Sequence, residues 1–250
     1  RNTMNYILAI NLLISVSFYE TLNAASHSRI VNGLSAKPNQ FPWQVSMMAC
    51  QARYLACSTC GGSIISPYFI LTAAHCIDDK DMFDVWMGSI SQFTPKQRYK
   101  STKKILHSDW DPKTLENDVG LIKLSQAIQE TPEVQIIKLV SKDVGTLNGQ
   151  LVTASGFGKI GYQKSSSTTL NFIDLKIISN KDCYRYYGGI SQHKLCATAT
   201  DPTQTVCHGD SGGPLVMIQG SDYVQVGVIS FTFSECKEGY PTGYARVSSY

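Results

Sequence analysis

The fold of this chain is decided by the stretch Cys207-His208-Gly209-Asp210-Ser211-Gly212-Gly213-Pro214-Leu215. A serine stands there among three glycines, one residue after an aspartate and four after a cysteine. Because glycine tolerates positive φ angles, the glycines predict a tight turn around Ser211. A serine hydroxyl is a weak nucleophile at neutral pH. Ser211 therefore needs a base within hydrogen-bond reach and a group that orients the base.

Two upstream stretches supply candidates for these roles, Leu71-Thr72-Ala73-Ala74-His75-Cys76 and Asn117-Asp118-Val119-Gly120-Leu121. His107, His193 and His208 compete with His75 for the role of base, but only His75 lies in the Thr-Ala-Ala-His-Cys context. The apolar residues after Asp118 place it at the start of a buried strand rather than in a solvated turn. A histidine, an aspartate and a serine in this chain order can form a charge-oriented nucleophile.

The composition is that of a globular protein of one or two domains, with 250 residues of which 43% are hydrophobic and 16% charged. A net charge of +3 without blocks of like charge gives no support to a nucleic-acid or membrane partner. Eight cysteines, an even number, indicate disulfides in an exported chain. Cys57-Ser58-Thr59-Cys60 lacks the second ligand pair of a zinc site, and the loop after Gly88 lacks carboxylates for calcium. We expect no metal and no other cofactor.

Short runs of β-branched and apolar residues recur, separated by Gly, Pro, Asn and Ser. These runs are Trp43–Met48, Gly62–Ile65, Tyr68–Thr72, Val119–Leu124, Val152–Ser155, Leu175–Ile178, Pro214–Ile218 and Val224–Ser230. Many short strands with turn signals predict an all-β sandwich or barrel, and periodicity alone does not choose between them.

The N-terminal segment Tyr6–Tyr19 is apolar and is followed by the small residues Ala24 and Ala25. It is too short to cross a bilayer comfortably, so a secretory signal peptide is favoured over a membrane span or a buried helix. We predict a signal peptide over residues 1–25, with Met4 as the true start and residues 1–3 upstream of it. The protein is then secreted and extracellular, without a membrane partner after signal removal.

Taken together, the three motif stretches resemble the trypsin/chymotrypsin family of serine proteases, and the resemblance runs from Ile30 to the last residue. It implies two six-stranded antiparallel Greek-key barrels with the active site in the cleft between them. Residues 30–250 then form the protease domain. Relatives continue into a C-terminal helix beyond the position of Tyr250, so we expect the sequence to be truncated there.

The resemblance also implies the role of each site residue. Ser211 attacks the substrate carbonyl to form an acyl-enzyme, His75 is the base, and Asp118 fixes the histidine tautomer. The backbone N–H groups of Gly209 and Ser211 form the oxyanion hole. Ser230 supports Asp118 and pairs with the substrate backbone. These roles are those of the family and are carried over by motif.

Arg29-Ile30-Val31-Asn32-Gly33 resembles the activation site of the family. Residues 26–29 are then a short propeptide, and cleavage after Arg29 frees the amine of Ile30. In relatives this ammonium pairs with the aspartate just before the nucleophile, here Asp210. The protein is therefore expected as a zymogen, with an activating protease that prefers Arg or Lys.

The disulfide pattern of the family implies the pairs Cys60–Cys76, Cys183–Cys196 and Cys207–Cys236. Cys50 and Cys57 remain outside this pattern, and we pair them as a local staple. Connectivity is not deducible from a sequence alone.

The substrate pocket differs from the best-known relatives. Thr205 stands at the pocket floor, where trypsin-like enzymes carry an aspartate, and a neutral floor does not compensate a buried cation. Thr232 and Thr242 stand where chymotrypsin-like enzymes usually have glycines. This pattern resembles elastases and favours cleavage after small or medium apolar residues. Chymotrypsin-like cleavage after Leu, Phe or Tyr is the alternative.

A non-catalytic protease-like binding protein is the competing class, although such relatives typically lose the serine or histidine that this chain keeps. The partners expected of an active enzyme are protein or peptide substrates and a trypsin-like activating protease, with protein protease inhibitors as further candidates. We expect a monomer. The sequence does not name the physiological substrate, the organism or the tissue.

Overall fold

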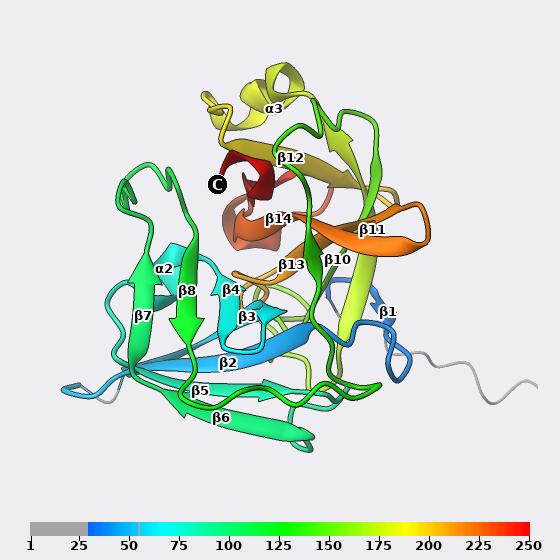
Figure 1. Ribbon diagram of the computed structural model, residues 1–250. Helices are drawn as coiled ribbons and strands as arrows, with labels where there is room; N and C mark the ends of the chain where they lie inside the picture. The colour runs from blue at the N-terminus through cyan, green and yellow to red at the C-terminus, as the bar shows by residue number, and fades with distance from the viewer. Residues whose placement is uncertain (1–29, 55) are drawn as a thin grey trace, which may run out of the picture.

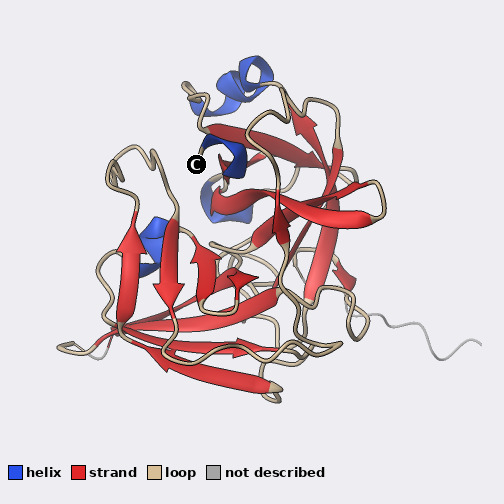
Figure 2. Ribbon diagram, in the orientation of Figure 1, coloured by secondary structure: helices blue, strands red, loops and turns tan. Residues whose placement is uncertain are grey.

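Most of the regular secondary structure is strand in this computed structural model, which describes residues 30–54 and 56–250 (Figures 1 and 2). The predicted signal peptide and propeptide, including Arg29, lie outside the described residues. No helix among those described is long and apolar enough to cross a membrane.

The N-terminal half forms a seven-stranded sheet in the order β6-β5-β2-β3-β4-β8-β7, and all its neighbouring pairs are antiparallel. Its strands are β2 (Gln44–Gln51), β3 (Ala56–Ser66), β4 (Phe69–Thr72), β5 (Met82–Met87), β6 (Gln97–Ser101), β7 (Lys103–Leu106) and β8 (Gly120–Lys123). The two edge strands β6 and β7 are separated in the chain by Thr102 alone. The sheet therefore curls into a half-barrel, because its two edge strands have to meet at this single connecting residue.

The C-terminal half closes fully, because β11 pairs with both β10 and β12 in a ring of the order β11-β10-β13-β14-β15-β12. The ring strands are β10 (Leu151–Gly156), β11 (Asn171–Ile178), β12 (Lys194–Ala199), β13 (Pro214–Gln219), β14 (Asp222–Phe231) and β15 (Thr242–Arg246). Two short strands join from outside: β1 (Leu34–Ser35) pairs with β11, and β9 (Lys138–Leu139) pairs in parallel with β14. The N-terminal segment thus crosses to the second barrel before the first begins (Figure 1).

Strict alternation explains why these segments form barrel walls. In β2, Val45, Met47 and Ala49 are fully buried, and in β11 the buried Ile173 and Leu175 alternate with exposed charged residues. Successive strand side chains point to opposite faces, so one face of each strand enters the core. One apolar cluster of buried side chains runs through both barrels.

Helices are few and short: α2 (Ala74–Ile77), α3 (Asn180–Tyr187) and the 3₁₀ turns η1 (Ser234–Cys236) and η2 (Val247–Ser249). The start of α3 is fixed by Ser179, whose hydroxyl accepts from the backbone N–H of Asp182 at 3.1 Å. Its end is fixed by Gly188, which adopts the left-handed conformation. Such caps satisfy the free backbone groups of helix ends.

The predicted all-β, two-barrel fold is confirmed. The expected six strands form the C-terminal barrel, which ladder hydrogen bonds close, whereas the N-terminal sheet has seven strands and its two edges are not paired with each other in the described chain. All eight predicted runs overlap strands of the structure, whereas β1, β5, β6, β7, β9, β12 and β15 were not predicted.

Buried polar side chains join the two barrels. The hydroxyl of Ser63 in β3 donates to Oε1 of Gln225 in β14 at 2.6 Å, and the hydroxyl of Ser155 in β10 donates to Oε1 of Gln44 in β2 at the same distance. All four side chains are buried. Buried polar groups stabilise a fold only when they are paired, so these bonds fix how the barrels face each other.

The first prediction tests this joint. Gln225→Leu leaves the buried hydroxyl of Ser63 without its acceptor, and should lower the free energy of unfolding by about 1–3 kcal/mol. Adding Ser63→Ala removes the orphaned group, so the double variant should recover part of the loss. Chemical denaturation with the disulfides intact measures both. Strictly additive losses in the double variant would contradict a direct bond between the two side chains.

Candidate active site

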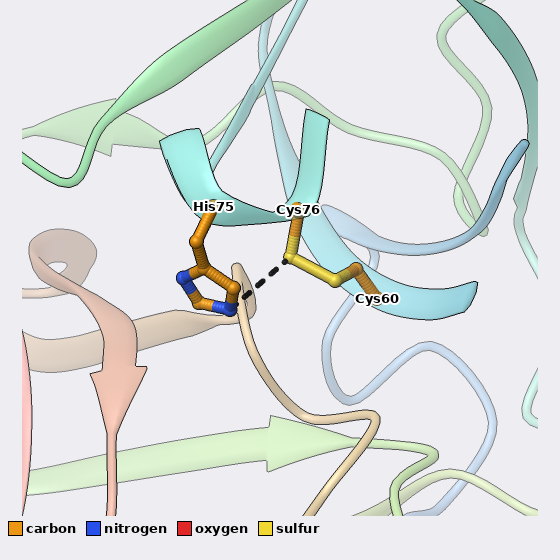
Figure 3. Close-up of side chains that lie close together, drawn as sticks. All are labelled: Cys60, His75 and Cys76. Carbon is orange, nitrogen blue, oxygen red and sulfur yellow. Dashed lines mark hydrogen bonds between the residues drawn. A yellow bond between two sulfur atoms is a disulfide. The ribbon is translucent and has the colours of Figure 1, made fainter. Parts of the chain in front are cut away.

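His75 lies on α2, the four-residue helix that directly follows β4. The next residue, Cys76, forms a disulfide with Cys60 in β3 and so anchors the short helix to the sheet. Figure 3 shows this arrangement, with Nε2 of the His75 ring 3.8 Å from the sulfur of Cys76. These three side chains are close enough together for a metal site, but both sulfurs are bonded in the disulfide and offer no thiolate ligand.

Asp118 is the buried acid beside this histidine, with 1% of its surface exposed. Its Oδ2 lies 2.8 Å from Nδ1 of His75, and its Oδ1 accepts from the backbone N–H of His75 at 2.9 Å. The carboxylate therefore holds both the ring and the backbone of the histidine. Hydrogen bonding at Nδ1 leaves Nε2 as the nitrogen that can accept a proton.

Ser230 reaches the same carboxylate from the other barrel, donating its hydroxyl to Oδ2 of Asp118 at 2.5 Å. The register between β14 and β15 shifts between Ile229 and Phe231, so Ser230 stands at a β-bulge. Bulges turn a side chain out of its regular alternation. Here the bulge directs the serine to the acid rather than into a ladder position.

Ser211 lies in the predicted glycine turn, between Gly209 with a φ of 97° and Gly212 with a φ of 80°. A Cβ at Gly212 would stand 2.2 Å from Oγ1 of Thr72, so no side chain fits between the barrels there. The carbonyl of Ser211 accepts from the N–H of Gly61 at 2.7 Å. The turn is thus fixed against the N-terminal barrel by its backbone.

The backbone N–H groups of Gly209 and Ser211 donate to no acceptor among the described residues. Free amides at such a turn can stabilise a negative oxygen that forms next to the serine. The Ser211 hydroxyl likewise has no hydrogen-bond partner in the described part of the chain. Both groups remain available to a substrate.

Ser211 and His75 line one cavity of about 250 Å³ between the barrels. The other lining residues are Val206, Cys207, His208, Ile229, Ser230, Phe231 and Thr232. Of the pocket residues expected from the sequence, Ser230 and Thr232 thus belong to this cavity. Val206, Ile229 and Phe231 were not predicted, although their position next to Thr205 and Ser230 in the chain was a usable signal.

Thr205 and Thr242 are not in the lining of this cavity. Both are buried, with 2% and 1% of their surface exposed. Thr205 pairs with Val31 in an isolated bridge, and Thr242 begins β15. Any effect of theirs on the shape of this cavity therefore has to act through the residues that line it.

His107 and His193, two of the competing histidines, lie around the ring of Tyr250 instead. The third, His208, is exposed beside Tyr162 and borders the cavity without contacting an acid. Among the described histidines, only His75 pairs with a carboxylate.

Asp210, the residue before Ser211, is fully buried. Its carboxylate accepts from the backbone N–H groups of Gly158 at 2.7 Å and Cys207 at 2.9 Å. A Cβ at Gly158 would lie 2.4 Å from the carboxyl carbon of Asp210, so only glycine leaves room for it. Burial raises the pKa of Asp210 to about 6, although both amide donors act to lower it.

Ile30, the first described residue, is also buried, at 1% exposure. Asp210 forms no ion pair within residues 30–54 and 56–250. The buried carboxylate therefore lacks a cationic partner in the uncleaved chain described here.

The eight cysteines form four disulfides: Cys50–Cys57, Cys60–Cys76, Cys183–Cys196 and Cys207–Cys236. These are the pairs expected from the sequence. Cys50 and Cys57 face each other directly across β2 and β3, so their bond staples one hairpin. Cys207–Cys236 ties the turn before Ser211 to η1.

Comparison with known proteins agrees with the family resemblance seen in the sequence, from residue 30 to residue 250. Residues 30–250 match the trypsin family. A chymotrypsin of Phaedon cochleariae is 33% identical over 226 residues, covering 88% of this chain and 79% of that protein. A brachyurin of Leptuca pugilator is 34% identical over 226 residues, covering 88% and 95%. Trypsin 5G1 of Aedes aegypti is 31% identical over 228 residues, covering 90% and 83%.

Among solved structures, HL collagenase superposes with a TM-score of 0.80 at 33% sequence identity. The match covers 88% of this chain and 95% of that one. The likeness therefore extends over both barrels.

The second prediction concerns Asp210. Its folded pKa of about 6 lies above the ordinary value of 3.8, so the uncleaved fold holds this proton more tightly than the unfolded chain does. The contribution is complete below pH 3.8 and is lost as the pH rises through about 6. The free energy of unfolding should fall by roughly 3 kcal/mol across this window, at about 1.4 kcal/mol per pKa unit.

Asp210→Asn cannot titrate and provides the control. The difference in unfolding free energy between the parent and this variant should change across the window, measured by denaturation of the uncleaved chain. A difference that stays constant with pH would show that Asp210 ionises as it would in water.

Proposed function

Because the chain belongs to the trypsin family of serine proteases, and is thereby a serine endopeptidase, we propose that it hydrolyses peptide bonds through Ser211, His75 and Asp118 after one activating cleavage. The observation that carries the proposal is the buried Asp118 carboxylate, 2.8 Å from Nδ1 of His75 in a cavity that Ser211 also lines.

In this mechanism Nε2 of His75 takes the proton of the Ser211 hydroxyl while its oxygen attacks the substrate carbonyl. Asp118 stabilises the imidazolium that results. The negative oxygen of the tetrahedral intermediate accepts hydrogen bonds from the free backbone N–H groups of Gly209 and Ser211. His75 then gives its proton to the leaving amine. A water molecule repeats the sequence on the acyl-enzyme and frees the enzyme.

Activation follows from the uncompensated Asp210. Cleavage after Arg29 frees an ammonium group at Ile30, and pairing with Asp210 would supply the cation that this buried carboxylate lacks. Residues 1–25 would act as the signal peptide that directs secretion of a monomeric zymogen. Activation would remove the propeptide, residues 26–29, and residues 30–250 would form the active protease domain. Its activator would cleave after Arg or Lys, and protein protease inhibitors would be its natural antagonists.

The cavity supports a preference for small or medium apolar residues before the scissile bond. Its volume is about 250 Å³ and its lining contains no carboxylate, so a buried lysine or arginine would find no counter-ion there. The side chains of Ile229 and Phe231 give it apolar walls. Thr232 narrows it directly, and Thr205 and Thr242 would act on it through the residues that line it.

The third prediction tests the triad and its activation together. A serine-directed fluorophosphonate probe should label the chain cut after Arg29 more strongly than the uncut chain, because only the cut chain can pair an Ile30 ammonium with Asp210 beside the oxyanion turn. Ser211→Ala should abolish labelling. Asp118→Asn should lower kcat by about 10⁴-fold, the loss known for the same change in this family. Equal labelling of the cut and uncut chains would contradict activation at Arg29.

The fourth prediction tests the pocket. On peptides that differ only before the scissile bond, we expect higher kcat/KM for Ala, Val or Leu than for Phe or Arg. Thr232→Gly with Thr242→Gly should raise the ratio for Phe over Ala by about 10-fold or more, because pocket shape sets such ratios. The two single variants separate the residue in the lining from the one outside it. An unchanged ratio would show that these threonines do not form the pocket walls.

A further inference from the structure

A groove of about 790 Å³ lies on the N-terminal half-barrel, away from the residues of the cavity around Ser211. It is formed by β2, β5, β6 and β7 and by the chain at the end of β8. Its floor is apolar and includes Met48, Met82, Phe83 and Leu124. The side chain of Met82 is 39% exposed, so much of its apolar surface lies open to a ligand in the groove and is not used in the core. Concave sites of this size with apolar floors are typical of binding sites.

The rim of the groove carries three exposed lysines, Lys100, Lys103 and Lys123. None of them forms an ion pair with a carboxylate among the described residues. Lys103 and Lys123 stand directly opposite each other in the β7–β8 ladder. Like charges in directly opposite positions destabilise a sheet. The fold therefore keeps a repulsive pair that an anion bound in the groove would relieve.

The remaining charged groups of the groove already have partners. Asp84 is held by Arg98, whose Nε donates to Oδ1 at 2.8 Å, so its negative charge is compensated from outside the lining. The Nζ of Lys104 donates to the backbone carbonyls of Ile77 and Lys80 at 2.7 Å. Lys104 thus fastens the groove wall to the end of α2. Lys100 stands directly opposite Asp84 in the β5–β6 ladder, so its charge is compensated in part. The positive charge that no described carboxylate compensates is that of Lys103 and Lys123.

We propose that this groove, lined by the rim lysines and the apolar floor, binds an acidic and apolar segment of a polypeptide. Such a segment would belong to a protein substrate and would dock apart from the residues at the scissile bond. In an extended peptide alternate side chains point to opposite sides, so apolar residues can enter the floor while acidic ones reach the rim. A fatty acid fits the groove less well, because it has a single carboxylate for three ammonium groups. A membrane surface fits less well because it is too broad to enter a groove.

Binding is tested on the uncut Ser211→Ala chain, so the result does not depend on the proposed catalytic mechanism. The probe is a fluorescently labelled peptide in which glutamate and leucine alternate, and fluorescence anisotropy measures its Kd. Lys100→Gln, Lys103→Gln and Lys123→Gln together should weaken binding about 10-fold or more, since each surface ion pair contributes a small factor. Met82→Ser should weaken binding without a change of charge. Added salt should weaken it as well.

The matched control changes three exposed lysines outside the groove, Lys142→Gln, Lys176→Gln and Lys181→Gln. It has the same net charge as the groove variant and should bind the peptide as the parent does. In the activated enzyme, the groove variant should cleave short peptides normally and lose its advantage only on a substrate that carries the acidic tail.

Three results would overturn the proposal. Equal weakening of binding in both triple variants would show that the peptide responds to the net charge of the protein and not to the lysines of the groove. No binding of the glutamate–leucine peptide would show that the groove does not accept such a segment. Binding of phosphatidylserine vesicles in place of the peptide would make the surface a lipid site.

Discussion

The carboxylate of Asp118 is the group on which the arrangement of this enzyme depends. It is buried between the barrels and receives hydrogen bonds from both: His75 comes from the first barrel and Ser230 from the second. A buried charge is tolerated only where donors surround it. A displacement of one barrel relative to the other would take the Ser230 hydroxyl away from this carboxylate and leave it only the two donors of His75. Hydrogen bonding to this one side chain and the packing of the two barrels therefore favour the same geometry.

A second buried acid, Asp210, lies in the turn around Ser211. The two aspartates differ in the partners that stabilise their negative charge. Asp118 has three donors, one of them a histidine that can become a cation. Asp210 has only two backbone amides and no cation in the described chain, and its raised pKa reflects this deficit. The proposed ammonium of Ile30 would supply the partner that this acid lacks, next to the nucleophile.

In the proposed function, substrates are recognised at two places in the fold. The cavity around Ser211 is small and free of carboxylates, so it can distinguish only the size and charge of one side chain. The lysine-rimmed groove shares no lining residue with this cavity and has a much larger volume. Because Lys104 ties the groove wall to the helix of His75, the two places share one structural element, although each recognises a different chemistry.

The sequence by itself determined the chemistry and the two-barrel fold. The motifs around His75, Asp118 and Ser211 identified the family, and runs such as Val224–Ser230 marked strands because β-branched residues recur in them at short intervals. Strand β6, with the sequence Gln-Arg-Tyr-Lys-Ser, was missed because polar residues hide its alternation, and α3 was missed although Ser179 and Gly188 frame it as caps. Only the tertiary structure decided that Thr205 and Thr242 are buried outside the lining of the cavity, that Ser230 lies at a bulge and bonds to Asp118, and that Lys103 faces Lys123. These features depend on strand register, which pairs residues far apart in the chain and leaves no trace in local sequence.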